Sequence, residues 1–321
     1  MSKTKKWSLA GIAMLAVFLA FFPIIVGGSA YYLSIAIEIG LLSIFAMSYD
    51  LLIGYTGIVS FGHAMFFGLG AYITGILMRN NNWGFIGTVP VVIIACGLLG
   101  LVIGLLTVRV KDTYFSMMTL ALGQLFFVIA TKAKNLTGGD DGLPGVPLLF
   151  RDKMTMYFVI TVIVVLAYLL LRRLTKSPTG KTLQAIRENE TRANMIGYNV
   201  LSYKLIIICI SSILAGFAGS LYVTYLGVAY PLLMHSSQTM QAIFMTIIGG
   251  SGTLYGPIIG AVLVKIISTV LSAFTQRWML IFGVLFVICV MLLPGGVVSI
   301  GKMGIVNMAK RLFEKKDKSD S

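Results

Sequence analysis

Charged residues are scarce in this sequence. Only 11% of the 321 residues are Asp, Glu, Lys or Arg, whereas 58% are hydrophobic. A soluble domain carries about 25% charged residues. The shortage of charge therefore excludes a soluble globular fold and indicates a protein whose outer face lies in lipid.

Cysteine and histidine are scarce as well, with three Cys and two His in the whole chain. Cys96, Cys209 and Cys289 each lie inside an apolar run, without CxxC or Cys/His spacing. His63 and His235 have no metal-ligand residues beside them in the sequence. The pattern thus predicts neither a disulfide framework nor a metal site.

Long hydrophobic runs are what the sequence has in abundance. A helix needs roughly 20 apolar residues to cross the hydrocarbon core of a bilayer. Runs long enough to span lie near 9–27, 31–53, 57–78, 86–108, 114–131, 154–171, 205–228, 255–275 and 278–298. A shorter apolar stretch at 238–250 suits a half-helix or re-entrant segment. We predict an all-α polytopic membrane helix bundle of about eight to ten transmembrane segments, some broken or re-entrant.

The first run has an alternative interpretation as a secretory signal peptide, because "KTKK" precedes it and "GGSA" follows it. Its apolar core is longer than the roughly 7 to 15 residues of a signal peptide. We therefore expect a retained membrane anchor.

Basic residues orient the chain in the membrane. With about ten segments, most Lys and Arg fall on the side that holds both chain ends, which the positive-inside rule places in the cytoplasm. The net charge of +14 then reflects orientation and does not indicate nucleic-acid binding. We expect a transmembrane domain over 1–300 and a basic amphipathic cytoplasmic tail over 301–321 that lies on membrane lipid.

The stretch "SPTGKTLQAIRENETRANMIGYN", residues 177–199, lies in the largest predicted cytoplasmic loop. Ser177 fits a helix cap, Pro178 the first helical position and Gly197 the end, so the sequence predicts one helix at about 177–197. Such a helix rests on the membrane or docks into a partner's groove. Its apolar stripe consists of Leu183, Ile186, Ala193 and Ile196.

Two further patterns in this stretch concern its chemistry. Glu188 and Arg192 are four residues apart, a spacing at which they can form an ion pair on another face of the helix. The run "GKT" at 180–182 resembles the end of a phosphate-binding P-loop, but that motif needs a glycine where Thr175 stands and a preceding strand. A predicted membrane span stands there instead, so we expect no ATP hydrolysis by this chain.

Two glycine clusters follow apolar segments and share a G-x-[ST]-G unit, "GYTG" and "GGSG". They predict broken helices at a central pathway, as an internal repeat produces, or close packing of unbroken helices. The candidate helix-break residues are Gly54, Gly57, Gly249, Gly250, Gly252 and Gly256.

Ionisable residues within predicted spans are costly in lipid and therefore candidates for function. Lys265 is expected to pair with Glu38 or Asp50, which holds helices in register. The alternative is a polar solute path. The candidates for that path are Glu38, Tyr55, Ser60, His63, Thr119 and Gln124.

Four stretches of the chain resemble one family. The run "GKTLQAIRENETRANMIGYNVLSYKL" is similar to the cytoplasmic coupling segment of the LivM-type permeases of ABC importers for branched-chain amino acids. The other three, in matching order, are "DLLIGYTGIVSFGHAMFFGLGAY", "RVKDTYFSMMTLALGQ" with "LTGGDDGL", and "IIGGSGTLYGPIIGA". Permeases for urea and short-chain amides share these motifs and are the alternative.

The resemblance implies a subunit without its own ATPase motif in a prokaryotic inner or plasma membrane, with ATP and Mg on partner subunits. Those partners are a second homologous permease subunit, two cytoplasmic ABC ATPase subunits and an extracytoplasmic solute-binding protein. It places the ATPase-coupling residues in the cytoplasmic segment: Leu183, Ala185, Ile186, Arg187, Glu188, Glu190, Ala193 and Gly197.

A proton-coupled secondary transporter is the alternative from another class. Glu38, Asp50 or His63 would then carry the coupling protons. A membrane-embedded enzyme ranks third, because the sequence shows no metal cluster and no pairing of a nucleophile with a base.

Overall fold

The computed structural model describes residues 29–108, 110, 112–275, 277–292 and 295–298, together with Pro23 and Gly27. The tail at 301–321 and nearly all of the predicted first span lie outside the described residues. The described part is almost entirely helical, which confirms the predicted all-α class. The helices are α2 (Ala30–Ile53), α3 (Ala64–Asn80), α4 (Phe85–Thr107), α5 (Asp112–Lys132), α6 (Lys134–Thr137), α7 (Lys153–Lys176), α8 (Pro178–Glu188), α9 (Glu190–Met195), α10 (Val200–Leu226), α11 (Ser236–Gly249), α12 (Tyr255–Phe274) and α13 (Trp278–Leu292).

Six of these helices, α2, α4, α5, α7, α10 and α12, are long and apolar enough to cross a membrane. In lipid a helix satisfies its own backbone polar groups, which explains why the apolar runs fold in this way. The helices α3, α11 and α13 are apolar but shorter, with 17, 14 and 15 residues. The predicted span at 57–78 begins too early, because the chain before Ala64 is irregular and Gly57 has a positive φ of 77°.

The centre of the bundle is α10, which packs against α2, α3 and α4. Small residues allow this close approach. A methyl group added at Gly70 of α3 would collide with the backbone of Gly216, and one at Gly219 would collide with the backbone of Phe67. The two helices therefore touch through their backbones over about one helical turn.

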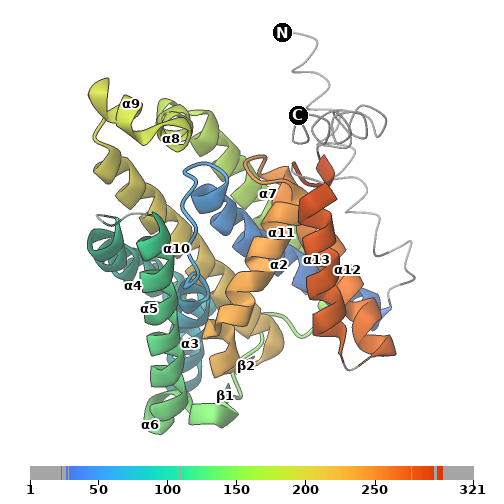
Figure 1. The fold of residues 1–321 in the computed structure, drawn as a ribbon. Helices are drawn as coiled ribbons and strands as arrows, with labels where there is room; N and C mark the ends of the chain where they lie inside the picture. The colour runs from blue at the N-terminus through green and yellow to red at the C-terminus, as the bar shows by residue number, and fades with distance from the viewer. Residues whose placement is uncertain are drawn as a thin grey trace, which may run out of the picture.

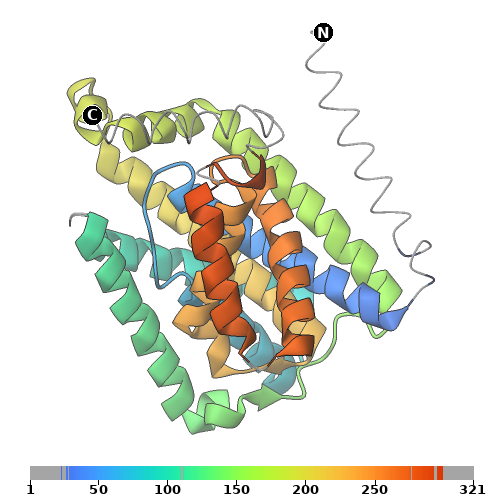
Figure 2. The same ribbon diagram turned by 45° about the vertical axis from the view of Figure 1, so that its right-hand side comes forward.

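A second group of helices, α11, α12 and α13, packs side by side and meets the rest of the bundle mainly through α2 (Figure 2). The second half of α12, beyond Val264, contains only half-buried and exposed residues. The buried faces of these helices share an apolar cluster around Met245, Ile248 and Phe282.

The two ends of the bundle differ in structure (Figure 1). At one end lie α8 and α9. At the other lie α6, the 3-10 helices η1 (Gly139–Asp141) and η2 (Pro231–Met234), and the antiparallel strands β1 (Leu143–Pro144) and β2 (Val228–Ala229). In β1 and β2, Leu143 pairs with Ala229. The strands thereby tie the connection after α5 to the end of α10.

Candidate functional site

The predicted cytoplasmic helix is two helices in the structure. Asn189 separates α8 from α9 in an extended conformation, with φ −161°. Its side-chain oxygen accepts a hydrogen bond from the backbone N–H of Arg192 at 2.8 Å and so caps α9. The prediction of one continuous helix over 177–197 is therefore wrong, because Asn favours a cap over a helix interior. With the helix broken, Glu188 and Arg192 form no ion pair among the described residues.

The predicted boundaries of this segment are confirmed. Ser177 Oγ accepts a hydrogen bond from the backbone N–H of Gly180 at 3.3 Å, and Pro178 occupies the first turn of α8. Gly197 has a φ of 98°, and its N–H donates to the carbonyl of Asn194 at 2.9 Å. A positive φ suits glycine after a helix end.

Three of the four residues of the predicted apolar stripe face their own chain, whereas Ile196 is exposed. The exposed fractions of Leu183, Ile186 and Ala193 are 2%, 3% and 3%. The helix α8 lies against α7 and α10, and Ile186 packs with Ala193 and Val200. The expectation that the stripe enters a partner's groove is thus wrong for these three side chains. Their burial fastens the segment to the bundle, as an amphipathic helix face does.

The outward surface of the segment is formed by other residues. Met195 and Ile196 are 83% and 70% exposed, and Tyr198 is 41% exposed. We call these three residues the apolar tip. The predicted coupling residues Ala185, Arg187, Glu188, Glu190 and Gly197 are also exposed.

An ion pair missed by sequence reasoning fixes α9. Lys204 Nζ of α10 lies 2.7 Å from Glu190 Oε2. The Lys204 side chain is 9% exposed and the Glu190 side chain 54% exposed. The two residues are joined across the turn at Gly197, and no local sequence pattern predicts such a pair.

The two glycine clusters meet in space at the end of α2. Gly54 ends α2, and Gly250 ends α11. A methyl group at Gly54 would collide with the backbone N of Gly252, and one at Gly249 would collide with the backbone of Gly256. Some of these glycines therefore stand at helix ends and others allow close packing, while their place at a central pathway stays a prediction.

A buried carboxylate holds the two clusters together. Asp50, fully buried in the last turn of α2, accepts hydrogen bonds from the backbone N–H of Gly252 at 2.7 Å and of Leu254 at 3.2 Å. These amides supply the hydrogen-bond partners that a buried carboxylate needs. We call the four residues Asp50, Gly54, Gly252 and Leu254 the glycine junction.

Arg187 of α8 reaches this junction. Its Nη1 donates a hydrogen bond to the carbonyl oxygen of Gly54. The α8–α9 segment is thus connected to the point where α2 ends and where the chain breaks between α11 and α12.

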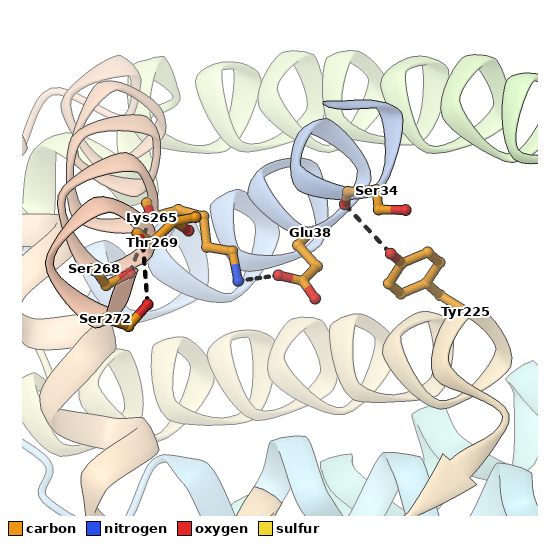
Figure 3. A network of polar contacts seen from close by, with 7 residues as sticks. All are labelled: Ser34, Glu38, Tyr225, Lys265, Ser268, Thr269 and Ser272. Carbon is orange, nitrogen blue, oxygen red and sulfur yellow. Dashed lines mark hydrogen bonds and ion pairs between the residues drawn. The ribbon is translucent and has the colours of Figure 1, made fainter. Parts of the chain in front are cut away.

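Glu38 of α2 and Lys265 of α12 form an ion pair (Figure 3). The Glu38 and Lys265 side chains are 20% and 26% exposed. Beside them, the hydroxyl of Tyr225 on α10 donates to the carbonyl of Ser34 at 3.3 Å. The pair confirms one of the two predicted partners of Lys265 and joins α2 to the second half of α12.

The other candidate path residues are not gathered with Glu38. His63 is fully buried, with Nε2 2.9 Å from Ser48 Oγ and its ring stacked on Phe45. Thr119 Oγ1 accepts from the N–H of Phe61 at 3.2 Å. These contacts show His63 and Thr119 packed inside the bundle.

Ser60 and Tyr55 are also buried, whereas Gln124 is exposed on α5. The structure therefore does not bring the six candidates together around one cavity among the described residues. A path that uses some of them together with another subunit stays a prediction.

The described residues form a bundle of membrane-length helices, and an amphipathic segment packs across one end of it and bonds to a break between helices. This is the architecture of a polytopic membrane protein. The family model described as "Branched-chain amino acid transport system / permease component" matches residues 31–291. This chain belongs to that family.

Several curated permeases are similar to the chain. The high-affinity branched-chain amino acid permease protein LivM of Escherichia coli K12 is 24% identical over 282 residues, which cover 79% of this chain and 66% of that protein. The probable LivM of Methanocaldococcus jannaschii is 25% identical, covering 86% of this chain and 95% of the relative. The ribose import permease protein RbsC of Haemophilus influenzae is 23% identical over 57% of this chain and 60% of that protein. No solved structure matches the chain.

Proposed function

We propose that this chain is the permease subunit of an ATP-driven importer and that it translocates branched-chain amino acids delivered by an extracytoplasmic binding protein. The observation that carries the proposal is the α8–α9 segment within a chain of the permease family: its inner face is fastened to the bundle and its apolar tip is exposed. The names of the LivM relatives support branched-chain amino acids over urea or short-chain amides.

The apolar tip supports docking of a cytoplasmic ATPase subunit. Large apolar side chains on a charged cytoplasmic segment are unfavourable in water and are typical of an interface core. The exposed coupling residues Ala185, Glu188 and Gly197 would surround this core. The buried side chains of Leu183 and Ile186 would hold α8 rigidly against the bundle.

A second permease subunit would cover α5. Gln124 stands near the middle of that helix on its exposed face, where an amide in contact with lipid lacks hydrogen-bond partners. A partner helix supplies such partners. The apolar neighbours of Gln124 on this face are Met117, Leu120, Leu125 and Val128.

ATP and Mg would bind to the ATPase subunits and not to this chain. The "GKT" run lies at the start of α8, directly after the membrane helix α7, and Thr182 Oγ1 donates to the carbonyl of Pro178 at 3.1 Å. A phosphate-binding loop instead follows a strand and leaves this hydroxyl free for Mg. Both chain ends would lie in the cytoplasm of a prokaryotic cell, which fits relatives from bacteria and an archaeon.

Reconstitution tests the proposal. The chain is co-purified with the products of neighbouring ATPase and permease genes and placed in proteoliposomes with the encoded binding protein. Labelled leucine should accumulate only when ATP and the binding protein are both supplied. The purified chain alone should hydrolyse no ATP. ATP-dependent uptake of urea in place of leucine would contradict the proposed substrate.

A further inference from the structure

The side chain of Arg187 runs along surfaces that glycines leave open. A Cβ atom at Gly57 would lie 3.3 Å from Arg187 Cγ, and one at Gly252 would lie 3.3 Å from Arg187 Nη1. Between them the guanidinium donates to the Gly54 carbonyl. Glycines of both clusters therefore contact this one side chain of α8, which is otherwise exposed.

The carbonyl that Arg187 binds belongs to a tightly connected unit. Gly54 follows Asp50 by one helical turn, and the Asp50 carboxylate holds the amides of Gly252 and Leu254. The guanidinium is also close enough to Asp50 for a favourable electrostatic interaction. A displacement of Gly54 therefore moves the end of α2 together with the chain break between α11 and α12.

The junction has the backbone freedom that a hinge needs. Gly57, Gly250 and Gly252 have φ values of 77°, 117° and 79°, in a region that residues with a Cβ rarely adopt. Hinges are a few positions at element ends that absorb changes in φ and ψ. The chain can thus change direction here while α11 and α12 stay helical.

The remaining attachments of α8 are of a different kind. Leu183 and Ile186 pack against the bundle through apolar contacts, which are non-directional. A charge-assisted hydrogen bond to a carbonyl has a defined direction and is stronger than a neutral one. Apart from the chain connection to α7, Arg187 is therefore the side-chain contact of α8, among the described residues, that transmits a displacement in a defined direction.

Resting on the proposed function, we propose that Arg187 is a positioning residue that couples the ATPase to the membrane helices. Displacement of α8 by the docked ATPase would act through Arg187 on Gly54 and change the angle of α11 and α12 against α2. The solute path would open and close through that change. The residue touches neither ATP nor solute in this account.

Uncoupling is the expected result of replacing Arg187. The Arg187→Ala variant should assemble with the ATPase and hydrolyse ATP, but leucine transported per ATP hydrolysed should fall about tenfold or more, because coupling between sites is typically worth about 5- to 150-fold. Arg187→Lys keeps the charge but lacks the planar fork, so its ratio should lie between those of Arg187→Ala and the unmodified complex. Uptake and hydrolysis are measured on the same proteoliposomes.

Arg192→Ala is the matched control. Arg192 lies on α9, is exposed, and its side chain has no hydrogen bond or ion pair with the described residues. This variant should transport as much leucine per ATP as the unmodified complex. It separates the loss of the Gly54 contact from the loss of one positive charge on the segment.

Three results would overturn the coupling proposal. The first is a ratio for Arg187→Ala within about twofold of the unmodified complex, less than typical coupling requires. The second is loss of the ATPase from a well-folded Arg187→Ala permease, which would make Arg187 a docking residue. The third is loss of assembly in both Arg187→Ala and Arg187→Lys, which would make it a folding residue. Failure of the unmodified complex to take up leucine with ATP would instead contradict the proposed function.

Discussion

The Met195→Asp, Ile196→Asp double variant should release the ATPase from an otherwise intact permease and abolish uptake. Both side chains are more than two-thirds exposed, so the substitutions leave the interior of this chain unchanged. Buried anchors at the centre of an interface each contribute about 2 kcal/mol or more. Loss of two of them should weaken docking by roughly a thousandfold. The measurement is co-purification of the ATPase with the tagged permease at equal membrane expression.

Leu183→Asp is the matched contrast, because it changes an apolar residue of the same segment that faces inward. A buried, unpaired carboxylate costs several kcal/mol, so this variant should lower the yield of folded permease itself. Retention of the ATPase by a well-expressed Met195→Asp, Ile196→Asp variant would show that the apolar tip does not dock it. Wild-type stability and uptake in Leu183→Asp would contradict the burial of the segment's inner face.

Gly219→Val should prevent the bundle from folding. Gly219 of α10 lies against the backbone of Phe67 on α3, so a side chain there must push the two helices apart. Overpacking of a core costs about 1–3 kcal/mol even where side chains yield, and a backbone yields less readily. We expect a loss of at least about 3 kcal/mol of stability. Thermal unfolding in detergent and the monodisperse yield after purification measure the effect.

Gly283→Val is the control for this substitution. Gly283 lies in α13, and no heavy atom lies within 4 Å of a Cβ added there. Surface substitutions of this kind change stability by about 0.5 kcal/mol or less. Equal unfolding temperatures for Gly219→Val and the unmodified chain would contradict the close packing of α3 on α10.

Most membrane-length helices were predictable because the bilayer fixes their length and composition. The ends predicted for α2 and α4 lie within one or two residues of those observed. The start of α3 was not predictable in this way, because a glycine-rich run is compatible with close packing or with an irregular chain. Contacts between distant segments decide between the two, and here Ser116 and Thr119 of α5 bond the backbone of Val59 and Phe61.

The candidate site was predictable in place but not in orientation. Periodicity shows that Leu183 and Ile186 share one face of a helix, but it does not show what covers that face. The break at Asn189 did have a signal in the sequence. Asn is a preferred helix N-cap, and an acidic residue such as Glu190 is typical of the first turn that follows. The bond from Arg187 to Gly54 spans 133 residues, and no local pattern predicts it.

The energy source of uptake tests the central claim most directly. Leucine uptake is measured in cells that carry this importer as their leucine transporter, with the proton gradient and the ATP level varied independently. The account predicts that uptake survives collapse of the proton gradient while ATP is maintained and stops when ATP is depleted. Uptake that follows the proton gradient, and that disappears in a stably folded Glu38→Gln variant, would contradict it and support a proton-coupled transporter.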